Sequence, residues 1–265
     1  MSADLVPDDL WERVAPLLPA RPPRRRRYPG RLPADDRAAL RGIVYVLCKG
    51  VSWRDVPAEQ VGCSGVTAWR RLRDWTEAGV WPQLHEVLLA AGLLDMDDAA
   101  IDGSHVRALK RGDHTGPSPV DRARPGSKHH LIVDRHGTPL VVALTSGNRH
   151  DVTQLMPLLD AIPRIRGVRG RPRHRPSRLF ADRGYDYDKY RRLVRARGIT
   201  PKFARKGTPH GSGLGKTRWV VERTFAWLHQ FKRLRIRYEI RADLHLGLLQ
   251  LACSIICLRR LRIAF

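Results

Sequence analysis

Cysteine is scarce in this chain of 265 residues, and its four cysteines do not follow a metal-binding spacing. They are Cys48, Cys63, Cys253 and Cys257, and no pair has the two-residue gap that zinc and redox sites favour. Cys253 and Cys257 lie four residues apart in an apolar stretch, a spacing typical of buried helix positions. We therefore expect reduced thiols in a cytoplasmic protein without a disulfide framework.

Export and membrane signals are also missing from the sequence. The N-terminus, MSADLVPDDLWERV, begins with acidic residues and lacks the basic segment and apolar run of a signal peptide. The most apolar segment, Leu244–Leu258, contains His245, Gly247 and Gln250 and is shorter than a bilayer span. We therefore expect this segment to be a core helix.

Acidic residues are few compared with basic ones. The chain has 26 Asp and Glu against 49 Lys and Arg, which gives a net charge of +23. Such an excess requires a polyanionic partner, and nucleic acid is the leading candidate. An anionic membrane is the alternative, but the basic residues are spread along the chain and do not line one amphipathic helix. Hydrophobic residues make up 42% of the chain, so a packed globular interior is also expected.

Residues 1–93 are predicted to form a helical DNA-binding domain. Helices are expected from Pro7 to about Leu18 and from about Ala34 to Lys49, with Gly50 ending the second. Between them, PARPPRRRRYPGRLP indicates a loop or arm, because Pro and Gly interrupt regular structure. The arginines of this arm are candidates for phosphate contact: Arg24, Arg25, Arg26 and Arg27.

The segment GCSGVTAWRRLRDWTEAGVW predicts another helix in this domain, with Ser64 as its N-cap. Val66, Trp69 and Leu72 are expected on its buried side. After a short connection from an earlier helix, this arrangement suits a helix-turn-helix whose second helix enters the DNA major groove. A solvated surface helix is the alternative. The candidate DNA-contacting residues are Thr67, Arg70, Arg71 and Arg73.

From about Ala99 the pattern changes to strands alternating with helices. It predicts an α/β (α+β) domain over residues 94–265, built on a mixed sheet flanked by helices. KHHLIVDRHGTPLVVALTSG is expected to form a hairpin that turns between Asp134 and Thr138.

Three further helices are expected in this second half. Asp151 is expected to cap the first, the second is expected from about Tyr187 to Arg197, and a long third helix is expected to begin near Thr217. The segment ITPKFA, between the second and third, is expected to be a strand.

Two predicted strands end in an apolar run followed by an acid. AAIDGS ends at Asp102 and RLFADRG at Asp182. Adjacent strand ends would bring these carboxylates together, and one shared cation would offset the cost of placing them beside apolar residues. A pair of ordinary strand-end caps is the alternative.

A third acid interrupts the helix predicted for RWVVERTFAWLHQFKRL. At about 100° per residue, Arg218, Glu222 and His229 lie within roughly 40° of one another and form one polar stripe. An acid flanked by cationic groups suits a metal ligand whose neighbours approach phosphate. The alternative is a solvated Arg–Glu pair, worth only about a few tenths of a kcal/mol.

Several segments together resemble the DDE transposases of bacterial insertion sequences, in particular the group named after insertion sequence five. They are WRDVP, IDGSHVRA, GNRHD, ADRGYD and RWVVERTFAWLHQFKRLRIRYE, of which the last is the most specific. The resemblance covers nearly the whole chain. It implies a ribonuclease-H-like core in which Asp102, Asp182 and Glu222 coordinate two Mg²⁺ or Mn²⁺ ions.

The same resemblance implies partners and a location. Double-stranded DNA is expected as both element end and target, bound by a homodimer or a higher synaptic oligomer associated with the nucleoid. Neither a membrane partner nor a small-molecule cofactor is expected. The expected reaction is metal-dependent DNA cleavage at the terminal inverted repeats, followed by strand transfer.

The helix that carries Glu222 departs from a signature of related transposases, Tyr-x2-Arg-x3-Glu-x6-Lys. Arg218 and Glu222 fit this signature, whereas Gly215 occupies the Tyr position and His229 the Lys position. Other residues are then needed to hold the terminal phosphates. By helical phase the candidates are Lys232 and Arg233, one turn further on.

Four more polar residues lie near the ends of predicted core strands and are candidates for supporting the acids or contacting DNA: His105, Asn148, His150 and Asp151. Two alternatives to the transposase are a ribonuclease-H-like nuclease without strand transfer, which would use the same acids, and an inactive DNA-binding regulator. Recombinase chemistry through Ser104 or Tyr185 is disfavoured, because the sequence does not uniquely position an activating Arg cluster.

Overall fold

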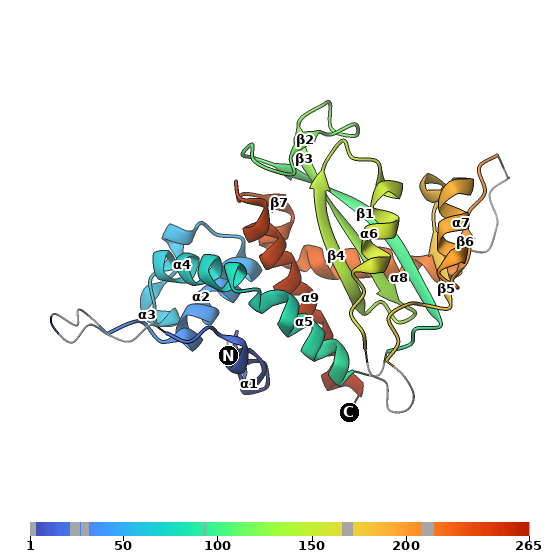
Figure 1. Cartoon of the computed structure of the whole chain (residues 1–265). Helices are drawn as coiled ribbons and strands as arrows, with labels where there is room; N and C mark the ends of the chain where they lie inside the picture. The colour runs from blue at the N-terminus through green and yellow to red at the C-terminus, as the bar shows by residue number, and fades with distance from the viewer. Residues whose placement is uncertain are drawn as a thin grey trace.

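One mixed sheet organises the second half of the chain in the computed structural model (Figure 1). The structure describes residues 4–21, 27, 32–92, 94–165, 172–207 and 215–264. The strands are β1 (Asp98–Ala108), β2 (Gly116–Pro117), β3 (Pro125–Asp134), β4 (Pro139–Ser146), β5 (Arg178–Ala181), β6 (Thr200–Phe203) and β7 (Ile236–Arg237). Their order is β2-β3-β1-β5-β6, with β4 paired to β3 and β7 paired to β1.

Strand directions divide the sheet into two parts that meet at β1. Strands β1, β3 and β4 pair antiparallel, whereas β5 pairs parallel to β1 and β6 pairs parallel to β5. The predicted hairpin is β3–β4. Its turn is held by Asp134, whose Oδ1 accepts from the backbone N–H groups of His136 at 2.9 Å and Thr138 at 2.7 Å. The expected mixed sheet is therefore confirmed.

The N-terminal segment is helical, as predicted. Its elements are α1 (Asp8–Val14), η1 (Ala15–Leu17), α2 (Asp36–Lys49), η2 (Trp53–Asp55), α3 (Ala58–Val61), α4 (Gly65–Glu77) and α5 (Val80–Ala91). Helix α2 ends at Gly50 with a φ of 71°, a left-handed conformation that glycine adopts without steric cost. The Ser64 side chain caps α4 by accepting from the Thr67 backbone N–H at 3.3 Å.

The buried face of α4 differs from the predicted one. Val66 is 52% exposed, whereas Ala68, Leu72 and Trp75 are buried. Gly65 packs against the backbone at Trp53, and a Cβ on Gly65 would stand 1.6 Å from the Trp53 carbonyl oxygen. Because of this close approach, the helix face that carries Gly65, Ala68 and Leu72 points into the protein. The expectation that Val66 is buried was therefore wrong.

Helices flank the sheet on both faces. They are η3 (Asp151–Gln154), α6 (Leu155–Asp160), η4 (Arg183–Tyr185), α7 (Asp188–Ala196), α8 (Gly215–Gln230), η5 (Lys232–Leu234) and α9 (Ala242–Ala264). In Figure 1, α6 lies in front of the sheet and α8 crosses behind it. The expected cap at Asp151 was wrong: His150 stands at the N-cap of η3 without a side-chain hydrogen bond. The Asp151 carboxylate instead pairs with Lys128.

Helix α9 joins the N-terminal helices to the sheet, since it packs against α4 and α5 on one side and against β4 and α8 on the other. It is longer than the sequence indicated, and Ala242–Ile263 is long and apolar enough to cross a membrane by length and composition. However, 72% of the most apolar part of this helix is buried inside the protein, as in a core helix. Cys253 and Cys257 lie in this helix as buried free thiols, as expected.

Candidate active site

The register between β1 and β5 brings the two predicted aspartates together. Ala99 pairs with Leu179 and Ala100 with Phe180, in parallel. Two residues further along each strand stand Asp102 and Asp182, and neighbouring strands lie about 4.8 Å apart. In this register Asp102, within β1, lies level with Asp182, just after the end of β5, although the two are 80 residues apart in the sequence. The expectation that the first strand ends at Asp102 was wrong, because pairing with β3 and β7 continues β1 to Ala108.

Asp102 is held in a largely buried position. Its side chain is 21% exposed, and its Oδ1 accepts from the Gly103 backbone N–H at 2.8 Å. Burial raises the pKa of Asp102 to about 6, and the negative charges of Asp182 and Asp151 add to this increase. The Gly103 hydrogen bond and the positive charge of Arg218 act in the opposite direction. The carboxylate thus stands where a cation would be favoured.

Asp182 has two roles in the structure. Its Oδ1 accepts from the Gly184 backbone N–H at 2.9 Å and so caps the short helix η4. The capping bond fixes the carboxylate beside the end of β5, level with Asp102. The strand-end cap and the paired acid, which the sequence offered as alternatives, are therefore both present at this residue.

Arg218 links the third acid to the first. Helix α8 packs across β1, β3 and β5 and carries both Arg218 and Glu222. The Arg218 Nη2 atom lies 3.6 Å from Asp102 Oδ2 and 3.8 Å from Glu222 Oε1. The Glu222 side chain is 65% exposed, whereas that of Arg218 is 21% exposed. Arg218 is therefore shared between an inner and an outer acid and does not form a simple solvated pair.

The donor set suits a hard divalent cation. Carboxylate oxygens are the ligands that Mg²⁺ and Mn²⁺ prefer, and the mutual repulsion at Asp102 is relieved by positive charge. In the part of the chain that the structure describes, no three His, Cys, Asp or Glu side chains are gathered closely enough to hold an ion. The guanidinium of Arg218 stands between Asp102 and Glu222 in this arrangement.

A buried Lys–Asp pair supports the strand that carries Asp102. The Lys128 Nζ atom, on β3, donates to Asp151 Oδ1 at 2.9 Å and to the Arg149 carbonyl at 2.8 Å. Asp151 presses against β1, so that a Cβ on Gly103 would stand 2.8 Å from Asp151 Oδ1. Sequence reasoning missed Lys128 but included Asp151 among the candidates for supporting the acids. The GNRHD segment indicated that this region is important. However, the sequence does not show which residues of different strands are in contact.

His130 completes this supporting group in a neutral form. Its Nε2 lies 2.7 Å from Thr145 Oγ1, and its Nδ1 lies 3.7 Å from Asp151 Oδ1. Burial lowers the pKa of His130 to about 4, and the charge of Asp151 only partly opposes this decrease. The imidazole is therefore uncharged at neutral pH.

The three other polar candidates lie around this site and bond to residues other than the acids. His105 Nδ1 is 3.4 Å from the hydroxyl of Ser118, and His150 Nε2 is 3.2 Å from that of Tyr187. Asn148 is exposed, with its Oδ1 close to Gly116. These contacts do not involve the acids.

The buried Tyr185 argues against recombinase chemistry through that residue. Its side chain is 1% exposed, and burial, together with the nearby charge of Asp102, raises its pKa well above the ordinary value. A nucleophilic hydroxyl requires access to DNA and a lowered pKa. Both properties of Tyr185 are the opposite of these requirements.

The side chains of α4 that were predicted to contact DNA differ in their exposure and in their contacts within the protein. Arg70 is exposed, whereas Arg71 lies 3.1 Å from Asp36 and Arg73 lies 2.7 Å from Asp74. The Thr67 hydroxyl bonds to that of Ser64 at 3.0 Å. In the N-terminal arm, Arg27 is exposed. The other predicted arginines of the arm, which are Arg24, Arg25 and Arg26, lie outside the described residues.

The helical-phase argument for Lys232 and Arg233 was wrong, because α8 ends at Gln230 and these residues belong to η5. Lys232 is exposed, but Arg233 is buried, with its Nη2 2.7 Å from Glu239 Oε1. His229 is half-buried on the last turn of α8, and burial lowers its pKa.

Two protein families match most of the chain. The family described as "Transposase DDE domain" matches residues 94–257, and the family described as "Putative transposase of IS4/5 family" matches residues 6–85. The acids and Arg218 all fall inside the first match.

Two individual relatives are described as putative insertion-sequence transposases. The chain is 62% identical over 148 residues to the "Putative transposase for insertion sequence element IS402" of Burkholderia cepacia, covering 56% of this chain and 70% of that protein. It is 29% identical over 140 residues to the "Putative transposase for insertion sequence element IS6501" of Brucella ovis, covering 50% of this chain and 98% of that protein. Among solved structures, the Mos1 strand transfer complex aligns with a TM-score of 0.33 and 12% identity, covering 86% of this chain and 80% of that chain.

Proposed function

The chain belongs to the DDE transposases of insertion sequences, and we propose that Asp102, Asp182 and Glu222 are its catalytic acids. Membership of this family makes it a metal-dependent polynucleotidyl transferase that acts on DNA, with a ribonuclease-H-like mixed sheet. In the proposed arrangement, residues 1–93 form a DNA-binding domain of helix-turn-helix type and residues 94–265 form the catalytic domain. The substrates are the terminal inverted repeats and the target DNA.

This assignment is supported by the register of β1 with β5 and by the position of Arg218 beside two of the acids. Asp102 and Asp182 are level on paired strands, and Arg218 lies within 4 Å of both Asp102 and Glu222. The three carboxylates hold two Mg²⁺ or Mn²⁺ ions in this proposal. When bound, such ions supply Lewis-acid activation of the attacking oxygen and stabilise the leaving oxygen.

Arg218 and the Lys128–Asp151 pair have different tasks in this proposal. Arg218 neutralises Asp102 and Glu222 and can then turn its guanidinium to a phosphate oxygen of the bound DNA, as bidentate guanidinium groups do. Lys128 balances the charge of Asp151, which packs against Gly103. Together the pair holds the β1 backbone in place beside Asp102.

DNA binding outside the site is assigned to exposed cations. Arg70 on α4, Arg27 in the arm and Lys232 after α8 are exposed, so they contact phosphates in this proposal. The same role is proposed for Arg24, Arg25 and Arg26, on the basis of the sequence alone. Two chains act together, because two element ends must be cut in concert, and the oligomer works on the nucleoid.

The test replaces each acid by its neutral isostere: Asp102→Asn, Asp182→Asn and Glu222→Gln. Each variant should lose Mg²⁺-dependent cleavage of DNA that carries the element ends by about a thousandfold or more, since metal activation supplies several kcal/mol. Affinity for the same DNA, measured without metal, should stay within about twofold. A joining assay with target plasmid separates a transposase from a simple nuclease.

Glu86→Gln is the matched control, because Glu86 is an exposed helical acid on α5, outside the site. It should cleave as the wild type does. Cleavage at wild-type rate by any of the three site variants would remove that residue from the assignment.

A further inference from the structure

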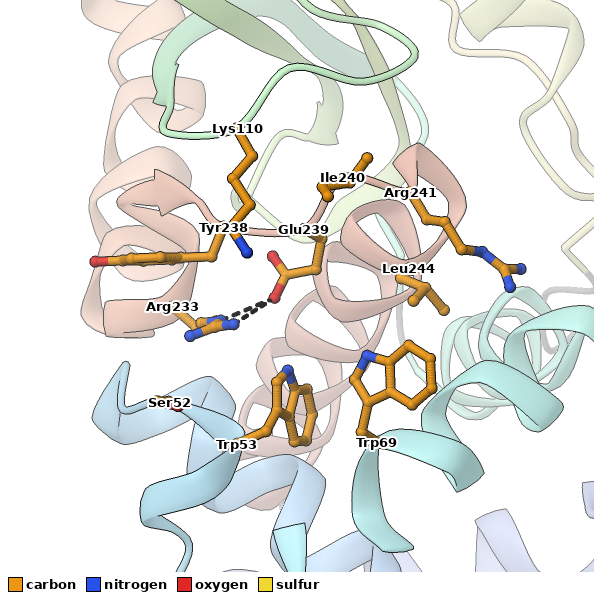
Figure 2. Close-up of a pocket in the computed structure, with 10 residues that line it drawn as sticks. All are labelled: Ser52, Trp53, Trp69, Lys110, Arg233, Tyr238, Glu239, Ile240, Arg241 and Leu244. Atoms are coloured by element: carbon orange, nitrogen blue, oxygen red, sulfur yellow. Dashed lines mark hydrogen bonds and ion pairs between the residues drawn. The ribbon is translucent and has the colours of Figure 1, made fainter. Parts of the chain in front are cut away.

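A cavity of about 570 Å³ opens where the N-terminal helices meet β7 and α9 (Figure 2). Its walls come from η2, α4, the segment after β1, and the turn that leads into α9. The residues that shape it are Trp53, Trp69, Lys110, Tyr238 and Leu244. Its volume lies in the range of about 300–1,000 Å³ that is usual for small-molecule and cofactor sites.

Aromatic side chains form much of the wall. In Figure 2 the indoles of Trp53 and Trp69 stand side by side on one side of the cavity, and the ring of Tyr238 lies across from Trp53. Trp53, Trp69 and Tyr238 are each half-buried, so part of each ring remains accessible. Such rings suit a flat, polarisable ligand.

The charges around the cavity favour an anionic group at its mouth. Lys110 is exposed at the rim. The only acid among the lining residues in the described chain, Glu239, is buried, and its Oε1 accepts from Arg233 Nε at 2.9 Å and Nη2 at 2.7 Å. The Arg233 guanidinium also lies 4.5 Å from the Tyr238 ring centroid. The negative charge of Glu239 is thus neutralised inside the wall.

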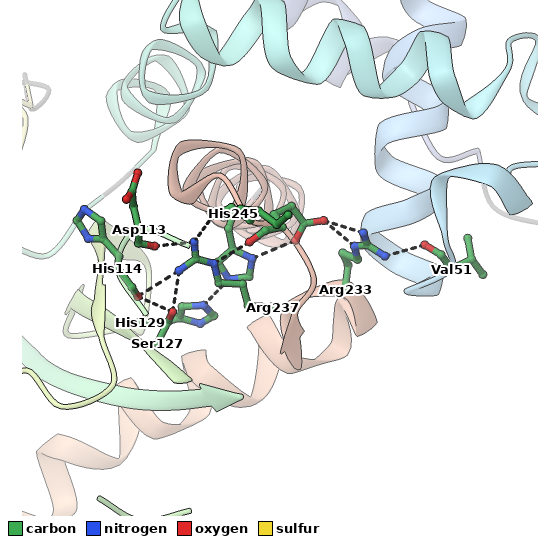
Figure 3. Close-up of polar contacts among 10 residues, drawn as sticks. Val51, Asp113, His114, Ser127, His129, Arg233, Arg237 and His245 are labelled. Atoms are coloured by element: carbon green, nitrogen blue, oxygen red, sulfur yellow. Dashed lines mark hydrogen bonds and ion pairs between the residues drawn. The ribbon is translucent and has the colours of Figure 1, made fainter. Parts of the chain in front are cut away.

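A buried polar network makes the wall rigid (Figure 3). Arg233 donates to the Val51 carbonyl at 2.9 Å, and Glu239 Oε2 lies 3.4 Å from His245 Nδ1. The other ring nitrogen of His245 is 2.9 Å from His129 on β3. The backbone after α2, η5, α9 and the sheet are therefore fixed relative to one another. A preformed wall lowers the entropy lost on binding.

Strand β1 runs from the candidate active site toward the cavity. Strand β7, directly before Tyr238, pairs with β1 at Arg107 and Ala108. Ala108 is six residues beyond Asp102 on this strand, which corresponds to about 20 Å. One DNA strand rises about 3.4 Å per nucleotide, so a substrate held at the acids reaches the cavity within about six nucleotides.

We propose that this cavity holds one unpaired nucleobase of the DNA substrate, stacked on Trp53 and Trp69, with its phosphate beside Lys110. Accessible aromatic faces next to a cation are how proteins bind unpaired bases. The net charge of +23 favours a nucleic acid over a second copy of the same cationic chain as occupant. The inference rests on the proposed function, because that function supplies the DNA.

The test compares two duplexes that differ in one unpaired 2-aminopurine, present as a bulge in one and absent from the other. The wild-type chain should bind the bulged duplex about tenfold more tightly, since stacking on an aromatic side chain is worth about 1–3 kcal/mol per base. It should also quench the 2-aminopurine fluorescence. Trp69→Ala should lose both the preference and the quenching, while its affinity for the paired duplex changes by less than about twofold.

Three further variants make the result specific. Trp69→Phe should keep most of the preference. Lys110→Gln should weaken bulge binding severalfold and lower its salt dependence by about one phosphate contact. Trp219→Ala is the matched control: Trp219 is 48% exposed on α8, outside the cavity, with Arg223 over its ring at 4.3 Å, and the variant should behave as the wild type does.

The inference is overturned if the wild type shows no preference for the bulge, or if a folded Trp69→Ala protein keeps it. Mg²⁺-dependent nicking by the wild type and by Asp102→Asn is measured in parallel. Nicking that depends on Asp102 without a bulge preference removes only the base pocket. A bulge preference with nicking that does not depend on Asp102 removes only the proposed catalytic acids.

Discussion

The pKa values of two buried carboxyl groups, each in its own cluster of charged side chains, are shifted in opposite directions. In the candidate site, burial raises the pKa of Asp102 to about 6, and Arg218 stands no closer than 3.6 Å. In the network around Glu239, burial also raises the pKa of the carboxyl. There the His245 hydrogen bond and the charge of Arg233, whose Nη2 is 2.7 Å away, reverse the effect and lower the pKa to about 2.

The opposite pKa shifts indicate that the Glu239 cluster stabilises the fold and that the Asp102 cluster is suited to bind a ligand. The partners of Glu239 more than offset its loss of hydration, so this network stabilises the fold. The partners of Asp102 do not, so the carboxylate keeps an unfavourable environment that a bound cation would relieve. Perturbed acids of this kind cluster at functional sites.

The largest expected effect separates the two clusters by stability. Glu239→Gln leaves Arg233 buried with a weakened partner, and loss of one member of a buried pair costs about 3–5 kcal/mol. Glu222→Gln changes an exposed side chain and should alter the free energy of unfolding by less than about 0.5 kcal/mol. Urea denaturation of both variants checks this expectation. Equal stabilities would mean that the Glu239 network is not structural.

A pH titration of stability should show opposite signs for the two acids. The folded pKa of Glu239 is below its usual value of 4.5, so its stabilising contribution is present above pH 4.5 and is lost as the pH falls toward 2. The folded pKa of Asp102 is above its usual value of 3.8, so protonation between pH 6 and 3.8 relieves a destabilising charge.

Buried imidazoles add to the loss of stability in acid. Burial lowers the pKa of both His85 and His130 to about 4, so the unfolded chain takes up protons between pH 6.5 and 4 that the folded chain does not. Proton uptake by each imidazole on unfolding lowers the free energy of unfolding by at most about 3 kcal/mol. Free energies of unfolding of the metal-free wild type and Asp102→Asn, measured from pH 7 to 3, check this. The variant should lose stability more steeply between pH 6 and 4, and parallel curves would contradict the assignment of opposite signs.

Arg218→Ala should affect cleavage more than stability. Removing a side chain that contacts metal-binding carboxylates typically costs about 10–100-fold in metal affinity or activity. Because Arg218 also lies where a cation is favoured, Mn²⁺ affinity without DNA should not fall, while cleavage should fall by that factor. Arg192→Ala, at an exposed position of α7, is the control. A loss of Mn²⁺ affinity equal to the loss of cleavage would show that Arg218 acts only by holding the acids.

The smallest effect is a gain in stability. Asp102→Asn removes a buried charge whose raised pKa corresponds to at most about 3 kcal/mol at neutral pH. Loss of the Arg218 contact offsets part of this, so we expect a gain of about 1 kcal/mol. Thermal unfolding of metal-free protein at pH 7 measures it. A clear loss of stability would mean that Asp102 is a structural residue of β1.

Local signals in the sequence predicted much of the fold. Ser64 and Gly50 mark helix ends through chemistry that acts within a few residues, and the Asp134–Thr138 turn is equally local. The apolar run before Asp182 identified the end of β5, whereas β1 continues past Asp102 to Ala108. Family resemblance then supplied the relation between these acids and Glu222, which local patterns do not contain.

What the sequence did not predict depends on contacts between distant segments. Lys128 and Asp151 meet because β3 and the GNRHD segment converge on Gly103. The buried face of α4 is set by the approach of Gly65 to Trp53, and Arg233 is drawn inward by Glu239. Periodicity alone cannot reveal these, because each is decided by a partner outside its own helix or strand.

The most direct test of the central assignment is anomalous diffraction from crystals grown with Mn²⁺ and a DNA end. The account predicts an anomalous peak bonded to carboxylate oxygens of both Asp102 and Asp182, with the Glu222 side chain turned toward the same position. Bound DNA with Mn²⁺ held by other residues, and none between these two aspartates, would contradict it.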